Sequence, residues 1–101
     1  MIGPNSIVIL YLKEPREKVW GLLLSLDQAG VVVRGISLDS FDDWCHELAK
    51  GESQFLGLSE VFYPYTRVEK IQLDEEGGSS PSFSERFRKI VGKDVREFLG
   101  I

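Results

Sequence analysis

The sequence predicts a mainly β domain with helices, built on a small, strongly bent five-stranded barrel in the order βββ-α-ββ-α. Two apolar runs within Val19–Val33 meet at the polar break Asp27–Gly30, a pattern typical of two paired strands joined by a turn. A glycine interrupts each of these strands, Gly21 in the first and Gly35 in the second. Because closing a sheet demands strong local bending, two glycine-bent strands in succession favour a small barrel over a flat sheet.

Length and composition set the outer limits. A chain of 101 residues is expected to form one domain, 1–101, with a single modest core, and its apolar fraction of 43% is typical of globular proteins. The net charge of −4 disfavours non-specific nucleic-acid binding. One cysteine, Cys45, cannot form an internal disulfide, and the N-terminal apolar run Ile7–Leu12 is too short to span a membrane. We therefore expect a cytoplasmic protein with no membrane partner.

Three strands are expected before the helix. Ile7–Leu12 has no polar alternation, which predicts a strand covered on both faces. The second strand, about Lys18–Leu26, and the third, Val31–Leu38, lie on either side of the polar break. Gly21 and Gly35 mark a bulge, a bend or a close approach of two backbones.

A helix inserted at about 40–50 is expected to follow the third strand. Ser40 is the predicted N-cap, and Gly51 ends the helix. Four apolar residues recur at the spacing of one helical face. They are Phe41, Trp44, Cys45 and Leu48. We expect the two aromatic residues of this face to anchor the helix to the barrel.

Two short strands are expected next, after a loop through Phe55–Leu58. They are Val61–Tyr65 and about Val68–Leu73. Pro64 cannot donate to a strand ladder, so it belongs at an edge, a strand end or a bulge.

The C-terminal quarter changes in character. A flexible polar connector is predicted at 75–82, followed by a C-terminal helical segment at 83–101. Ser82 and Glu85 have the spacing of a capping box, and an apolar stripe follows them. Its residues are Phe83, Phe87, Ile90 and Val91.

Four residues of the second strand and its turn follow a recognisable spacing, in which an aspartate stands six positions after a glycine and apolar residues lie between them. They are Gly21, Leu23, Leu26 and Asp27. In this spacing the chain resembles the first motif of the Sm-like family, which includes the spliceosomal Sm proteins and the bacterial RNA chaperone. The second motif is matched only at apolar positions, Val68 and Ile71, and lacks the Arg-Gly or Tyr-Lys-His of the family. The resemblance covers about 7–74, and a barrel of SH3-like lineage is the main alternative.

The resemblance implies two functions. The first is a non-enzymatic binding or assembly module, a homo-oligomer that pairs the fourth strand of one copy with the fifth strand of the next, with RNA or a protein as further partner. The alternative is RNA binding by Gln28, in the turn after the motif aspartate, with Tyr65 and Arg67 in the loop between the last two strands. Ala29 stands where the bacterial members place a stacking aromatic ring, so it forfeits about 1 to 3 kcal/mol per base.

No catalytic residue, metal site or cofactor is expected. Cys45 and His46 are neighbours in the predicted helix and point about 100° apart, so they do not form a nucleophile and base pair. Asp42 with His46, and Asp43 with Glu47, share helix faces, but two ligands alone make a weak metal site. The run from Gly57 to Ser59 begins like a nucleophile elbow and lacks its closing glycine.

Five basic side chains gather in the C-terminal segment, whereas the helix at about 40–50 is acidic. They are Arg86, Arg88, Lys89, Lys93 and Arg96. The simplest interpretation is a solvated helix face with cations near its C-terminal end. Two alternatives are a surface for an anionic partner and a head-to-tail contact between protomers, acidic helix against basic helix.

Overall fold

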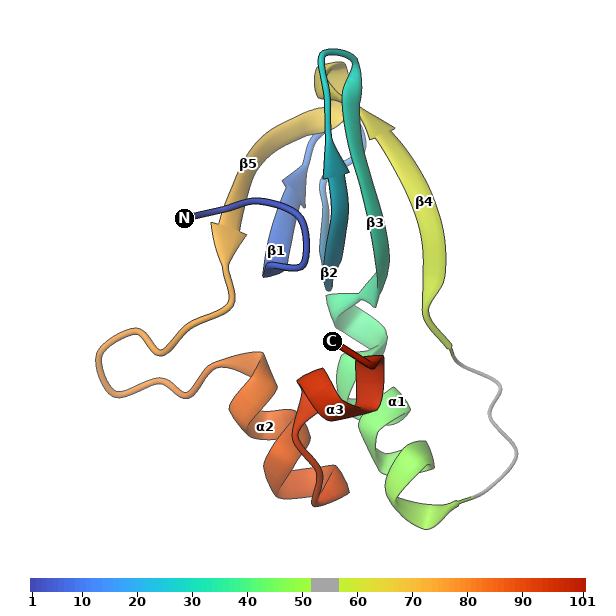
Figure 1. The fold of residues 1–101 in the computed structure, drawn as a ribbon, viewed down its shortest axis with the longest axis vertical. Helices are drawn as coiled ribbons and strands as arrows, with labels where there is room; N and C mark the ends of the chain where they lie inside the picture. The colour runs from blue at the N-terminus through green and yellow to red at the C-terminus, as the bar shows by residue number, and fades with distance from the viewer. Residues whose placement is uncertain (52–56) are drawn as a thin grey trace.

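A computed structural model describes residues 1–51 and 57–101, and over these it contains one five-stranded antiparallel sheet and three α-helices (Figure 1). The strands are β1 (Ile7–Leu12), β2 (Glu17–Leu26), β3 (Gly30–Ser37), β4 (Ser59–Pro64) and β5 (Val68–Leu73). The helices are α1 (Leu38–Lys50), α2 (Phe83–Val91) and α3 (Val95–Leu99), and a short 3-10 helix, η1 (Tyr65–Arg67), joins β4 to β5. The mainly β character with attached helices is as predicted.

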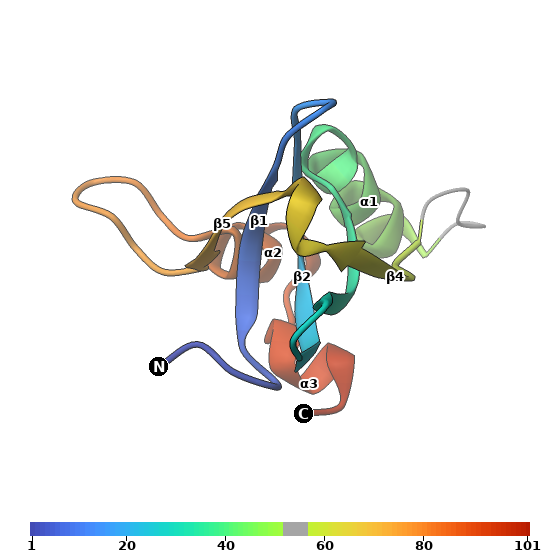
Figure 2. The same cartoon turned by 90° about the horizontal axis from the view of Figure 1, so that it is seen from above.

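The sheet is strongly arched, and its strands follow the order β4-β3-β2-β1-β5. In Figure 1, β4 and β5 form the two sides of the arch, and Figure 2 shows them crossing over β1 and β2. The predicted barrel is not confirmed, and the sheet is not closed, because in the part of the chain that is described β4 pairs only with β3 and β5 only with β1. The three-residue η1 carries the chain from one sheet edge to the other and does not fold β5 back along β4.

The predicted hairpin is the pair β2 and β3, and Asp27 builds its turn. The Oδ1 atom of Asp27 accepts hydrogen bonds from the backbone N–H of Ala29 at 2.9 Å and of Gly30 at 3.1 Å. Gly21 lies opposite Gly35 in the register of the two strands. A Cβ atom on Gly21 would lie 2.5 Å from a backbone oxygen of β3, so the predicted close approach is confirmed.

Strand β1 is covered on both faces, as its uninterrupted apolar pattern predicts. Ile7 and Ile9 pack toward the helices, whereas Val8 and Leu10 pack toward the inside of the arch. The alternation follows from the two-residue period of a strand.

Helix α1 begins at Leu38, earlier than predicted, and its cap is Ser37 in place of Ser40. The Oγ atom of Ser37 accepts a hydrogen bond from the backbone N–H of Asp39 at 3.3 Å. Strand β3 passes into α1 without a connecting loop, so Ser40 already lies within the first helical turn. The predicted end is confirmed, since Gly51 adopts a left-handed conformation with φ of 66°.

The predicted C-terminal helical segment consists of two helices, α2 and α3. Helix α2 ends at Gly92, whose φ of 84° suits a glycine, and Asp94 caps α3. One of the two hydrogen bonds of the predicted capping box of α2 is confirmed, because the Oγ atom of Ser82 accepts from the backbone N–H of Glu85 at 3.1 Å. Of the loop predicted through Phe55–Leu58, residues 55 and 56 lie outside the described residues.

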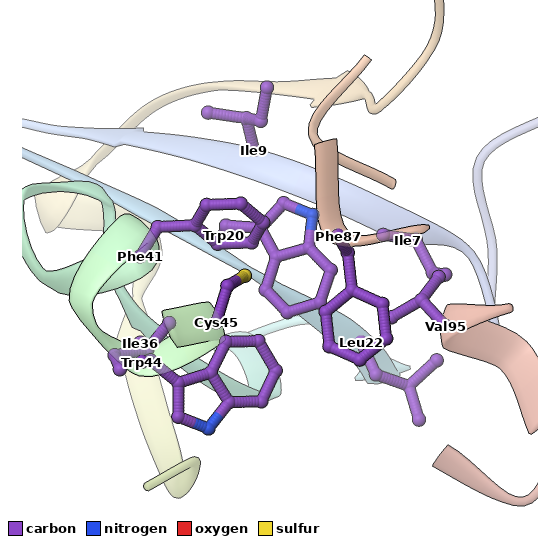
Figure 3. Packing of buried hydrophobic residues seen from close by; sticks show 10 residues of the cluster. All are labelled: Ile7, Ile9, Trp20, Leu22, Ile36, Phe41, Trp44, Cys45, Phe87 and Val95. Carbon is purple, nitrogen blue, oxygen red and sulfur yellow. The ribbon is translucent and has the colours of Figure 1, made fainter. Parts of the chain in front are cut away.

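Two hydrophobic clusters lie on opposite faces of the central strands. The helix-side core, drawn in Figure 3, joins β1, β2 and β3 to all three helices and consists of Ile7, Ile9, Trp20, Leu22, Ile36, Phe41, Trp44, Cys45, Phe87 and Val95. The inner core fills the arch and consists of Val8, Leu10, Leu12, Val19, Leu23, Val31 and Val33. Both predicted anchors of α1, Phe41 and Trp44, are 1% exposed.

Candidate functional site

The open edges of the sheet and the turns at the top of the arch form the candidate site. At the top, the β2–β3 turn lies against η1 (Figure 1), and the backbone N–H of Tyr65 donates to the carbonyl oxygen of Ala29 at 3.1 Å. Gln28 is exposed in this turn, and Tyr65 is 40% exposed. Two of the three residues predicted to bind RNA are therefore brought together on one surface.

The third residue, Arg67, holds the β1–β2 turn to η1. Its Nε atom donates to the carbonyl oxygen of Lys13 at 2.6 Å, and its Nη2 atom donates to that of Pro15 at 3.2 Å. The same Nη2 atom lies 3.3 Å from a carboxylate oxygen of Glu17. The guanidinium thus has three acceptors within the chain, and RNA binding by Gln28, Tyr65 and Arg67 stays a prediction.

Tyr63 lies beside this contact, on the inner face of β4. It lines a hollow of about 270 Å³ together with Val33 and Val61. Burial raises the pKa of the Tyr63 hydroxyl, the Glu17 carboxylate raises it further, and the Arg67 guanidinium opposes the change. Tyr63 is therefore a neutral packing residue at physiological pH, with no sign of an activated phenolate.

The register of β4 against β3 shows which backbone amides of β4 point away from the sheet. Because the N–H of Tyr65 points toward β3 and because antiparallel pairing alternates along a strand, the amides of Tyr63 and Val61 also face β3. The amides of Phe62 and Glu60 then point away from the sheet. The backbone nitrogen of Pro64 also points away from the sheet, but it carries no hydrogen to donate. Phe62 also leaves 49% of its side chain exposed.

The edge of β5 has the same property on the other side of the arch. The N–H of Asp74 donates to the carbonyl oxygen of Ile7 at 2.9 Å, so the amide of Gln72 faces β1 as well. The amides of Ile71 and Leu73 consequently point away from the sheet. Among the residues that the structure describes, no strand pairs with the outer edge of β4 on one side or of β5 on the other (Figure 2).

The only thiol and the only imidazole of the chain, Cys45 and His46, differ in their exposure to solvent. Cys45 is fully buried in the helix-side core, and burial, with Asp42 adding to it and Arg86 opposing it, raises the pKa of its thiol to about 12. The Nδ1 atom of the exposed His46 lies 2.7 Å from the backbone carbonyl oxygen of Asp42. A buried thiol of such high pKa is a poor nucleophile.

Within 1–51 and 57–101, no group of three or more His, Cys, Asp or Glu side chains could hold a metal ion. Over the same residues, no helix combines the length and the apolar character needed to cross a membrane.

The carboxylate of Asp74 accepts four hydrogen bonds on the helix side of the sheet, and sequence reasoning missed it. Its Oδ1 atom accepts from the N–H of Phe83 at 2.8 Å, and its Oδ2 atom accepts from the N–H of Ser84 at 2.8 Å and from the Oγ of Ser84 at 2.6 Å. The indole Nε1 of Trp20 also donates to Oδ2, at 3.1 Å. Asp74 therefore fastens the end of β5 to the start of α2. No local pattern could reveal it, since its partners lie 9, 10 and 54 positions away.

Some basic side chains of the C-terminal segment bind groups elsewhere in the chain. Arg86 forms an ion pair with Asp42 of α1. Arg96 donates to the carbonyl oxygen of Asn5 at 3.3 Å. Arg88 and Lys89 remain on the exposed surface of α2.

Comparison of the chain with protein-family models, with curated proteins and with solved structures finds no match.

Proposed function

We propose that this chain is a non-enzymatic assembly module of the Sm-like type, which associates with copies of itself by pairing the β4 edge of one copy with the β5 edge of the next. The observation that carries the proposal is the pair of unpaired, unlike edges on the two sides of the arch. Support for the Sm-like type comes from the motif spacing between Gly21 and Asp27 and from the strongly bent five-stranded antiparallel sheet.

Unpaired strand edges attract further strands, because each outward N–H and C=O gains a partner when another strand is added. A net gain of about 0.5–1.5 kcal/mol for each hydrogen bond makes a row of such bonds a substantial contribution. The exposed ring of Phe62 adds apolar area on the β4 side. Nothing comparable is available elsewhere on the sheet, since β1, β2 and β3 are paired on both sides.

The two edges are different surfaces, so their contact is head-to-tail. A head-to-tail contact generates a ring when the rotation between copies closes and an open filament when it does not. Pro64 limits the length of the pairing, because it removes one outward donor at the end of β4. We place the assembly in the cytoplasm, where a buried free thiol such as Cys45 stays reduced.

A proline at position 62 tests the proposal. Phe62→Pro removes one outward amide from β4, whereas Phe62→Ala removes the same ring and keeps the amide. Light scattering coupled to size exclusion over a hundredfold concentration range is expected to show assemblies of the wild type and of Phe62→Ala above the 11.4 kDa of one chain. Phe62→Pro should stay monomeric at the same concentrations. A wild type that keeps a mass near 11.4 kDa throughout would overturn the proposal, as would equal association of the two variants.

A further inference from the structure

The helical layer is asymmetric with respect to the two sheet edges. In both views, α1 lies on the side of β4 and α2 lies on the side of β5 (Figures 1 and 2). The contacts agree with this placement. Helix α1 continues directly from β3, the only described neighbour of β4, and Asp74 at the end of β5 binds the first amides of α2.

The two helices carry opposite charge. Helix α1 has one basic residue, Lys50, against four carboxylates, which are Asp39, Asp42, Asp43 and Glu47. Helix α2 has one carboxylate, Glu85, against three basic residues, which are Arg86, Arg88 and Lys89. The β4 side of the helical layer is therefore acidic and the β5 side is basic.

The chain already contains one contact of this kind. The carboxylate of Asp42 on α1 pairs with the guanidinium of Arg86 on α2, and this ion pair lies between the two helices. Asp39 and Asp43 stay exposed on α1, and Arg88 and Lys89 stay exposed on α2. The outer parts of the two helices thus retain complementary charges that the fold itself does not bring together.

We infer that in the assembly the acidic α1 of one copy docks beside the basic α2 of the next, so that the second copy is recognised by charge as well as by strand pairing. This inference rests on the proposed function. Joining the β4 edge of one copy to the β5 edge of the next brings the acidic side of the first helical layer to the basic side of the second. Joining β4 to β4 would bring two acidic helices together, and joining β5 to β5 would bring two basic helices together. Like charges at an interface disfavour the wrong pairing, so the helices select head-to-tail contact.

Reversing the charge on one helix at a time tests this inference. The acidic-side variant is Asp39→Lys with Asp43→Lys, and the basic-side variant is Arg88→Glu with Lys89→Glu. None of these residues belongs to a sheet edge. The control is Lys13→Glu with Arg16→Glu in the exposed β1–β2 turn, because it changes the net charge by as much as the basic-side variant and leaves both helices unaltered.

At low salt, each helix variant alone is expected to associate at least about tenfold more weakly than the wild type, which corresponds to about 1.4 kcal/mol. The control should associate as the wild type does. An equimolar mixture of the two helix variants should regain assembly, because every interface then joins opposite charges. Raising the salt to 0.5 M should reduce the differences, since exposed charges are screened.

The outcomes separate the inference from the proposed function. A wild type that stays monomeric would overturn both. A wild type that associates, together with helix variants that associate equally well, would leave edge pairing intact and overturn the charge selection. A mixture that fails to regain assembly would also overturn it, since the loss would then not come from mismatched charge.

Discussion

The two faces of the central strands are closed in different ways. On one face, the helix-side core is covered by three helices and is dominated by aromatic rings. On the other face, the inner core is aliphatic and is covered by the curled sheet itself, which ends in two open edges. The helices thus close one face of the sheet, whereas the sheet edges are the surfaces for which we propose pairing between copies.

The aromatic packing explains how the helix side closes. The ring of Trp20 on β2 lies 5.0 Å from that of Phe41 and 5.6 Å from that of Trp44, centroid to centroid. Trp44 in turn lies 5.5 Å from Phe87 of α2 and 5.9 Å from Phe98 of α3. One ring of α1 thus contacts the sheet and both C-terminal helices, as Figure 3 shows for the sheet and α2.

Removing the indole ring of Trp44 should have the largest effect on the free energy of unfolding. Trp44→Ala is expected to lower the free energy of unfolding by about 3–5 kcal/mol, because the side chain is 1% exposed and its loss leaves a cavity. Phe62→Ala, on the open edge, should change it by no more than about 0.5 kcal/mol. Urea denaturation measures both. Similar losses in the two variants would contradict the division between the two faces.

Strands β2 and β3 approach each other closely at the paired glycines Gly21 and Gly35, where there is no room for a side chain. Gly21→Ala is expected to cost about 1–3 kcal/mol, since its Cβ would meet backbone atoms of β3 that cannot move without bending the sheet. Gly57→Ala is the matched control, because no atom of the described residues beyond its chain neighbours lies within 4 Å of its Cβ position. Equal urea midpoints for the two variants would mean that the sheet bends elsewhere.

The attachment of the helices to the sheet can be tested at Asp74. Asp74→Asn replaces one acceptor oxygen by an NH2 group, which must then face the donor of Phe83 or those of Ser84 and Trp20, so a loss of about 1–3 kcal/mol is expected. Ser84→Ala removes a single hydroxyl bond and should cost about 0.5–1.5 kcal/mol. A change in the near-ultraviolet circular dichroism of Asp74→Asn would show that the loss of the hydrogen bond alters the surroundings of Trp20. A variant as stable as the wild type would show that α2 is held by apolar packing alone.

Ionisation of Cys45 is expected to change the stability least near neutral pH and to act only in alkaline solution. Its pKa in the folded protein is raised from 9.0 to about 12, so burial of the neutral thiol stabilises the fold below pH 9. This contribution should be lost as the pH rises from about 9 to about 12. A thiol reagent at pH 8 should therefore react only as fast as the chain unfolds. Rapid reaction under native conditions would mean that the helix side opens more readily than its packing indicates.

The local features of the fold could be predicted from the sequence, whereas the features that depend on distant residues could not. The two-sided burial of β1, the turn at Asp27 and the close approach of two strands at Gly21 each leave a pattern within a few residues. The open sheet depends on the path of η1, and the role of Asp74 depends on partners elsewhere in the chain.

The same distinction between local and distant contacts applies to the candidate site. The sequence places Gln28 and Tyr65 in turns, and the structure brings these turns together at the top of the arch. The contacts of Arg67 with the β1–β2 turn span more than 50 positions, so no spacing could show them. The outward direction of the Phe62 amide likewise follows from the register of β4 against β3, two strands that α1 separates in the chain.

Amide hydrogen exchange, measured by NMR at low and at high protein concentration, tests the central claim most directly. The amides of Phe62 and Ile71 point outward from β4 and β5, whereas those of Tyr63 and Gln72 are paired within the sheet. Edge pairing predicts that the exchange of Phe62 and Ile71 slows as the concentration rises and that Tyr63 and Gln72 stay protected throughout. Fast exchange at Phe62 and Ile71 at every concentration would contradict the claim that the two open edges join one copy to the next.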